Sequence, residues 1–595
     1  MSLASLIAPF AALAVLGIAG LGLAGLVAPR AAGEAQAALA PLATAAVLFL
    51  TTPLVLAGLP PLLVAGTILG LLALVTVIRR HASLSIARAS AVPAALACVA
   101  IVVSASPALT HGTWAAATTG NQDAYIWVSQ ARSLEHDPSR GQQSTTPDRA
   151  AYDLLSHESW PTAIPGSLSE LAAATRIDPV HAYGVFVALI VALLGLSVFF
   201  GARACLQWSR RRASVVAFLV TVNGLVLLSS FYGWQAQLLI TTMGTLFVLT
   251  LSECFESKSG VRDCVAPALF AAAAISVYGW TVAPFVGVGL VVALDAWRRR
   301  RQTMSLTALA TRLGTVGVLT LVFGAVAITR AFITLVHGSQ HVSAEVLSYW
   351  RQYAWAFPSD ALGLVPRTPR DVPGLGWEVL ALIVAAALIV RGLQSARSSK
   401  NPRNTVLAAG GLTIIVELVV LAAGGSTPYP SLKLMAYSGP LLTLLVVCAH
   451  SWRTERTNTE GRAARLGALG LAFVNVTAAC FFLATTAYAL SVGFDKTRPA
   501  TEVLPVARAA NQLPRGKVVQ IAVEDAWDQV WLAYYLRDHP IALRTASVAF
   551  AGYSVKDAAR AQKYDTPADF VIRERSPGPA VWSGKRFAIY KLHAN

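Results

Sequence analysis

Long apolar runs are the feature that most constrains this chain. They recur from the N-terminus to about residue 490, as in 182–202 and 404–424. A helix needs roughly 20 such residues to cross the hydrocarbon core of a bilayer. A barrel strand would need about ten residues of alternating polarity instead, and the sequence lacks that alternation. The runs therefore predict a polytopic α-helical membrane protein.

Composition supports this class. Hydrophobic residues make up 55% of the 595 residues and charged residues only 13%, which is about half the charged fraction of soluble domains. The formal net charge of +17 would suit nucleic acid, but arginine accumulates in cytoplasmic loops of membrane proteins, so we expect no nucleic-acid partner. The six cysteines lie in or beside apolar runs, and their spacing indicates neither disulfides nor zinc.

The connections between the runs alternate in charge. Basic residues follow every second run, as at Arg79 and Arg80 or Arg298 to Arg301, whereas short connections of the other parity, such as 59–61, carry none. Positive loops stay in the cytoplasm, so we expect a plasma-membrane protein whose polar segment 110–181, loop 337–375 and tail are extracytoplasmic, together with the N-terminus. About 13–14 spans are predicted, near residues 5–28, 37–58, 60–78, 90–109, 182–202, 213–231, 234–252, 264–279, 281–297, 313–336, 376–393, 404–424, 433–450 and 466–491.

The chain divides into a transmembrane core, 1–492, and a soluble tail, 493–595. In the tail, "KVVQIAV", "IALRTA", "DFVIRE" and "RFAIYKL" read as strands, and "DAWDQVWLAYYLRDH" reads as a helix. This pattern predicts a small extracytoplasmic α/β domain. Asp525 fits a helix cap. The tail has no glycine-rich phosphate loop, so we expect no nucleotide chemistry there.

One carboxylate stands out in the first external segment, within "TTGNQDAYIWVSQARSL". The apolar spacing after Asp123 predicts a short helix along the membrane surface that starts at this residue. Asp123 then either caps the helix, with its charge stabilised by the helix dipole, or serves as a general base for an acceptor hydroxyl. The two roles are compatible, because a capped carboxylate is also a positioned one.

Other polar and aromatic residues are candidates for binding. Lys433 lies at the outer start of a span, against the positive-inside bias, so it either binds a lipid phosphate or extends toward water. Arg351, Arg330 and His341 are further candidates for the donor phosphate. The candidates for the acceptor or sugar are polar or aromatic residues at the same side, and the same aromatics would also suit an interfacial belt: Tyr125, Trp127, His157, Glu158, Trp160, Tyr232, Gln235 and Tyr429.

The combination resembles the GT-C superfamily of integral-membrane glycosyltransferases, which use polyprenyl-phosphate sugars. The likeness rests on the acid in "NQDAYIWVSQARSL", the continuation "SWPTAIPGSL", the late "YPSLKLMAYSGPLL" and the external tail. The long stretch before the acidic loop looks most like actinobacterial cell-envelope enzymes, including arabinofuranosyltransferases. Many GT-C enzymes carry the acidic loop directly after their first span, whereas several spans precede it here.

The resemblance implies an inverting transfer from a polyprenyl-phosphate sugar to a cell-envelope glycan or glycolipid. Asp123 would act as base, and cations would stabilise the leaving phosphate. No cofactor is obligatory, no metal ligand set is predicted, and dependence on a divalent metal stays open. A transporter or flippase is the main alternative, although such proteins often contain inverted repeats, which we do not find in the sequence. A glycan polymerase or ligase would also use lipid-linked substrates.

Overall fold

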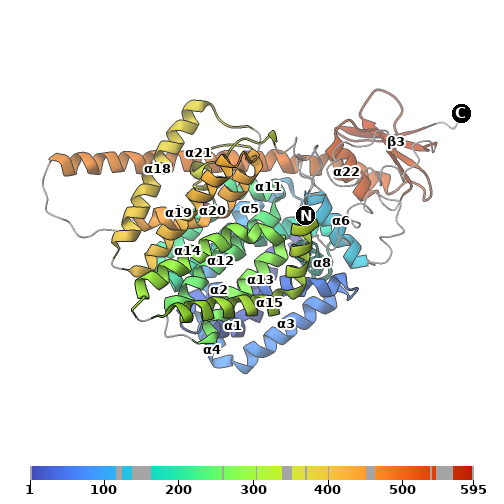
Figure 1. The fold of residues 1–595 in the computed structure, drawn as a ribbon. Helices are drawn as coiled ribbons and strands as arrows, with labels where there is room; N and C mark the ends of the chain where they lie inside the picture. The colour runs from blue at the N-terminus through green and yellow to red at the C-terminus, as the bar shows by residue number, and fades with distance from the viewer. Residues whose placement is uncertain are drawn as a thin grey trace.

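The computed structural model describes residues 3–114, 123–136, 162–256, 260–302, 304–337, 351–368, 371–399, 401–449, 462–536, 539–543 and 567–592. Four predicted site residues, His157, Glu158, Trp160 and His341, lie outside these ranges. Helices form one large bundle, and a small sheet follows it at the C-terminal end of the chain (Figure 1).

Long apolar helices make up most of the bundle, and shorter helices connect some of them. The first half of the chain contains α1 (Leu3–Val27), α2 (Gly33–Leu56), α3 (Pro61–Ile78), α4 (Arg80–Arg88), α5 (Ala91–His111), α6 (Asp123–His136), α8 (Ala163–Thr175), α9 (Pro179–Phe200), α10 (Arg210–Thr221), α11 (Gly224–Phe231) and α12 (Gln235–Glu256). The second half contains α13 (Val265–Tyr278), α14 (Ala283–Arg300), α15 (Leu306–His337), α17 (Pro358–Ala361), α18 (Leu375–Ser398), α19 (Thr405–Ala423), α20 (Pro428–Ala449), α21 (Arg462–Ala510) and α22 (Ala526–Tyr535).

Among the described residues, twelve helices are long and apolar enough to cross a membrane, or thirteen if the bent pair α10 and α11 is one span. The pair occupies the predicted span 213–231 and bends by 45°, where the Asn223 side chain accepts a hydrogen bond from the backbone of Leu225. The predicted span 281–297 is α14, which ends in three arginines and is not among the twelve. The polytopic helical class is confirmed.

Ion pairs join the basic connections at one end of the bundle. Glu34, in the first turn of α2, lies 3.4 Å from Arg203 and 3.1 Å from Arg210. Arg30 lies 3.1 Å from Asp263 in the connection that follows α12. The α1–α2 connection therefore shares an end with the basic loops, which is the parity that the sequence predicts, and α1 starts at the opposite end.

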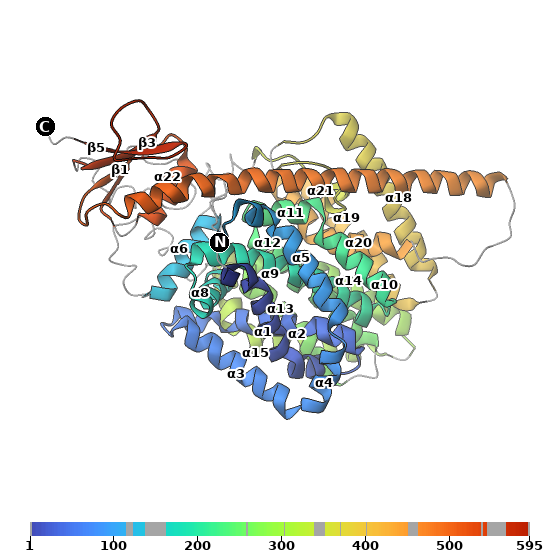
Figure 2. The same ribbon diagram turned by 180° about the vertical axis from the view of Figure 1, so that it is seen from behind.

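That opposite end carries α6, α8, α22 and the sheet, whereas α4 lies away from them (Figure 1, Figure 2). The sheet has the order β2-β1-β3-β5-β4, built from β1 (Val519–Ile521), β2 (Ile541–Leu543), β3 (Phe570–Glu574), β4 (Trp582–Ser583) and β5 (Phe587–Lys591). β1 pairs in parallel with β2 and β3, and β5 pairs antiparallel with β3 and β4. The small α/β tail domain is present, and Asp525 caps the start of α22 through the backbone of Asp528.

The tail is joined to the core by a continuous helix. α21 has 49 residues and passes without interruption through residue 492, where the composition of the sequence changes. Helical residues on both sides of this point allow the last span to continue directly into the tail. Movement of the tail relative to α21 is therefore restricted near this junction.

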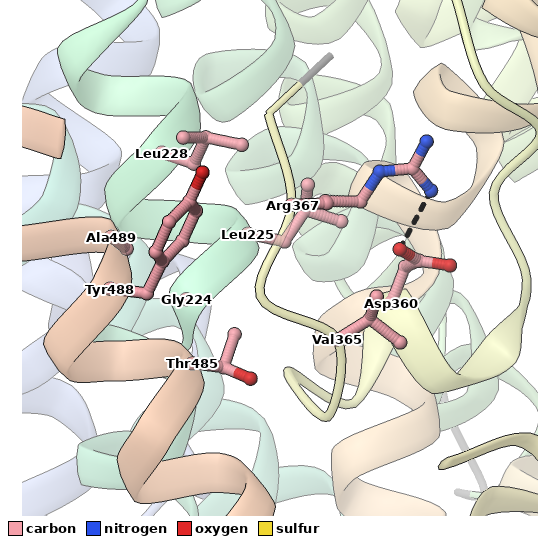
Figure 3. A pocket seen from close by; sticks show the side chains of 9 residues that line it. All are labelled: Gly224, Leu225, Leu228, Asp360, Val365, Arg367, Thr485, Tyr488 and Ala489. Carbon is pink, nitrogen blue, oxygen red and sulfur yellow. Dashed lines mark hydrogen bonds and ion pairs between the residues drawn. The ribbon is translucent and has the colours of Figure 1, made fainter. Parts of the chain in front are cut away.

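The segment between α15 and α18 is held by a buried ion pair (Figure 3). Arg367 lies 2.7 Å from Asp360, and both side chains are only 2% exposed. Arg367 also donates to the carbonyl oxygens of Trp355 and Ala354, and the second carboxylate oxygen of Asp360 accepts from the backbone of Phe357. Because both charges are hydrogen-bonded, they fix the shape of residues 354–367.

Candidate active site at the end that carries the tail

Asp123 is the first residue of α6, as the sequence predicts. The turn between α11 and α12 packs directly against this start. Gly233 has φ +83°, and a Cβ there would lie 3.3 Å from the Ala124 Cβ and 3.2 Å from the Tyr183 hydroxyl. A glycine is needed both for the backbone conformation and for the close approach. The turn therefore fixes the position of the residue next to Asp123.

Lys433 lies in the first turns of α20, surrounded by tyrosines. Its Nζ donates to the Tyr278 hydroxyl at 2.7 Å and lies 4.6 Å from the ring centre of Tyr429. Tyr429 in turn lies 4.9 Å from Tyr353 of the segment between α15 and α17. No carboxylate of the described residues lies within ion-pair distance of Lys433. The tyrosines therefore hold this ammonium group without neutralising its charge.

Asp123 and Lys433 are close enough to interact electrostatically. The charge of Asp123 acts on Lys433 and on the hydroxyls of Tyr183 and Tyr278. The two charged residues are 310 positions apart in the sequence, and helices α6, α9, α13 and α20 bring them together. This arrangement places in one region a carboxylate and a cation that has no carboxylate partner among the described residues.

Several buried polar groups near this region have no hydrogen-bond partner among the described residues. They include the Tyr183 hydroxyl, the Tyr437 hydroxyl and both amide atoms of Gln235, which is fully buried. The Gln235 amide lies beside the Tyr183 hydroxyl. Buried polar groups normally find partners, so these groups suit a ligand that carries hydroxyls or phosphate oxygens.

A hub centred on Asp178 connects α6 to the tail. Asp178 caps α9 through the backbone of Val180 at 3.1 Å and lies 2.6 Å from Arg132 of α6. It also accepts a hydrogen bond of 2.8 Å from the Tyr534 hydroxyl of α22. A ring contact of 5.8 Å between Tyr125 and Trp531 joins the same two helices. The helix that begins with Asp123 is therefore clamped between the bundle and the tail.

Three of the residues predicted to bind the acceptor or the sugar are covered by other parts of the protein. Tyr125 and Trp127 are buried, and Tyr125 packs against the tail rather than toward open space. Tyr232 is also buried, with Lys496 at 4.7 Å from its ring centre. These three rings are part of the packing around the site, because protein atoms cover them.

The two predicted arginines are placed relative to Lys433 only through their sequence neighbours. Arg330 precedes Ala331, which would contact a Cβ on Gly279 directly after Tyr278. Arg351 is exposed and lies two residues before Tyr353. Ala331 thus lies against the residue that follows Tyr278, and Tyr353 packs against Tyr429. Tyr183 and Tyr278 were not predicted from the sequence, and of these two Tyr278 has a direct hydrogen bond with Lys433.

No group of three or more His, Cys, Asp or Glu residues suited to a metal occurs among the described residues. Two further acids are buried outside the spans. Burial raises the pKa of Glu170 in α8 to about 8. Burial also raises the pKa of Asp528 in α22 to about 6, partly offset by Arg586 at 2.8 Å.

Comparison with known proteins gives structural likeness only. No family model matches the sequence, and no curated protein matches it. The fold is similar to ArnT from Cupriavidus metallidurans, solved bound to undecaprenyl phosphate, with a TM-score of 0.49 and 13% identity over 83% of this chain and 96% of that one. It is also similar to the Archaeoglobus fulgidus oligosaccharyltransferase, with a TM-score of 0.45 and 11% identity over 81% and 69%.

A third similar structure is the arabinofuranosyltransferase AftD from Mycobacteria, with a TM-score of 0.47 and 13% identity. That match covers 84% of this chain and 40% of AftD. Two of the three are described as sugar-transferring enzymes, the class that the motifs of this sequence resemble. All three TM-scores lie below 0.5, so the functional argument rests on the residues of this chain.

Proposed function

We propose that this protein transfers a glycosyl residue from a polyprenyl-phosphate sugar to a glycan or glycolipid acceptor of the cell envelope. The observation that carries the proposal is Lys433, an unpaired ammonium group held by tyrosines within electrostatic range of Asp123. A lipid phosphate supplies the missing negative charge. Its polyprenyl chain can remain in the bilayer between the helices.

The chemistry assigns one role to each charged group. The Asp123 carboxylate accepts the proton of the acceptor hydroxyl while that oxygen attacks the anomeric carbon. The bond from this carbon to the phosphate oxygen breaks, and polyprenyl phosphate leaves with its charge beside Lys433. Attack opposite the leaving group inverts the anomeric centre. Gln235 and Tyr183 offer hydrogen bonds to hydroxyls of the sugar, and Arg330 and Arg351 add positive charge near the phosphate.

Two ends of the bundle are proposed to face different compartments. The basic connections form one end, held by pairs such as Arg210 and Glu34, and the positive-inside bias supports a cytoplasmic location for it. Asp123, Lys433 and the tail would then be extracytoplasmic. Among donors, an arabinofuranosyl phospholipid is the first to test, because the sequence resembles arabinofuranosyltransferases.

The test uses purified protein in proteoliposomes with a panel of polyprenyl-phosphate sugars and oligosaccharide acceptors. Asp123→Asn should lower turnover by about 10²- to 10⁴-fold, the range typical of a lost general base. The control is Asp371→Asn, because Asp371 is bonded to Thr368 in an exposed turn and should keep full activity. Full turnover in Asp123→Asn would remove Asp123 as base. Substrate accumulation without glycan formation in the wild type would favour a transporter.

A further inference from the structure

Arg391 occupies an unusual position inside a predicted span. It belongs to α18, seven residues before the helix ends at Ser398, which corresponds to about 10 Å along the axis. One amino group of its guanidinium, Nη1, is buried without a hydrogen-bond partner among the described residues. An arginine at such depth is costly in hydrocarbon unless something pairs with it.

Other arginines at the same end of the bundle have protein partners. Arg403 lies 2.6 Å from Glu253, and Arg212 donates to the carbonyl oxygen of Val447 and lies over the Trp208 ring. Arg397, on the same helix as Arg391, is exposed at the helix end, where water can solvate it. Arg391 is half-buried, and no described residue forms a hydrogen bond with its buried Nη1.

A groove next to Arg391 has room for a ligand that pairs with the guanidinium group. Helices α18 and α21 cross (Figure 1, Figure 2) and are in contact where the Trp377 and Phe481 rings stack at 4.5 Å. Further along, they leave a groove of about 580 Å³, within the size range of small-molecule sites. The described residues that line it are apolar apart from two side chains of α18: Ala386, Ala387, Val390, Arg391, Gln394 and Leu471.

We propose that this groove binds an anionic phospholipid from the leaflet at the basic end of the bundle. The phosphate accepts charge-assisted hydrogen bonds from Arg391, and an acyl chain lies along Ala387, Val390 and Leu471. Among the described residues, no acidic side chain lines the groove, so the charge of Arg391 favours a lipid with net negative charge over a zwitterionic one. Basic pockets between membrane helices bind acidic lipid head groups for this reason. The site is separate from Lys433 and Asp123, which lie at the other end.

The proposal is tested by native mass spectrometry of the purified full-length protein. The protein is taken from nanodiscs that contain equal amounts of phosphatidylglycerol and phosphatidylcholine. The wild type should retain one phosphatidylglycerol, and Arg391→Gln should bind it roughly tenfold more weakly through loss of the charged donor. Arg397→Gln is the matched control on the same helix and should retain the lipid.

A second variant separates lipid binding from folding. Ala387→Trp keeps Arg391 but fills the groove from an exposed position on α18, and it should also lose the lipid while the thermal midpoint in phosphatidylcholine stays unchanged. Equal retention of phosphatidylglycerol in the wild type, Arg391→Gln and Ala387→Trp would overturn the proposal. A dimer without retained lipid, or displacement of the lipid by millimolar inorganic phosphate, would also overturn it.

Discussion

Replacement of Asp178 by alanine should loosen α6 and separate it from the tail. Three contacts are lost together: the cap of α9, the pair with Arg132, and the hydrogen bond from Tyr534. The cap contributes about 1 kcal/mol. The Arg132 pair is partly exposed, with side chains 20% and 30% accessible, so it adds about 1 kcal/mol or less. The bond from Tyr534, which is fully buried, adds about 1–3 kcal/mol.

The sum of about 3 kcal/mol corresponds to an increase of roughly 150-fold in local opening. Hydrogen exchange measured by mass spectrometry on the full chain in nanodiscs tests this value. Peptides of α6 and α22 should exchange much faster in Asp178→Ala, whereas peptides of α12 should not change. Asp178→Asn keeps an acceptor for the cap and for Tyr534, so it should have a smaller effect.

Asp371→Asn serves as the control, because its turn touches neither α6 nor α22 through the bonds described. Exchange in α6 should then equal that of the wild type. If α6 in Asp178→Ala exchanged within about threefold of the wild type, a hub at Asp178 would not hold the helix. The clamp between the bundle and the tail would then have to rest on apolar contacts such as that of Tyr125 with Trp531.

Three other changes test separate parts of the structure. The pKa of the Asp528 carboxyl is raised to about 6 in the folded chain. The protonated carboxyl therefore stabilises the fold fully at pH values below its ordinary pKa, and this contribution is lost as the pH rises through about 6. Thermal unfolding between pH 5 and 7.5 should vary less in Asp528→Asn than in the wild type. Arg367→Met leaves Asp360 buried and unpaired, which should cost about 3–5 kcal/mol and speed tryptic cleavage in the segment between α15 and α18; equal cleavage rates would mean that the ion pair does not hold this segment. Gly233→Ala places a side chain at φ +83° against Ala124, which should cost about 1–2 kcal/mol and reduce turnover, and an unchanged turnover would mean that the turn does not position α6.

The sequence predicts what depends on local pattern. Apolar runs gave the membrane helices, the alternation of arginines gave the parity that Glu34 and its pairs support, and apolar spacing after Asp123 gave the start of α6. Lys433 stood out because a cation at the outer end of a span runs against the positive-inside bias. The apolar runs and the spacing after Asp123 are local signals, whereas the alternation of arginines is read by comparing successive connections along the chain.

Contacts between distant segments were not predictable in the same way. Tyr278 and Lys433 are 155 residues apart, and a tyrosine near the end of a span is typical of any membrane interface. The continuity of α21 was not predictable either, because a change in composition at residue 492 does not require a break in the backbone. The role of Asp178 depends on Tyr534, 356 residues further along the chain, and only the folded structure brings them together.

The affinity for polyprenyl phosphate tests most directly whether Lys433 binds the donor phosphate while Asp123 acts as a separate base. Binding to the wild type, Lys433→Met and Asp123→Asn is measured on purified protein in nanodiscs by tryptophan fluorescence or calorimetry. Lys433→Met should bind at least tenfold more weakly, because a charge-assisted contact is lost. Asp123→Asn should bind as tightly as the wild type or more tightly, because a negative charge near the phosphate is removed. Wild-type affinity in Lys433→Met, or loss of binding in Asp123→Asn, would contradict a donor phosphate held by Lys433 in front of a separate base.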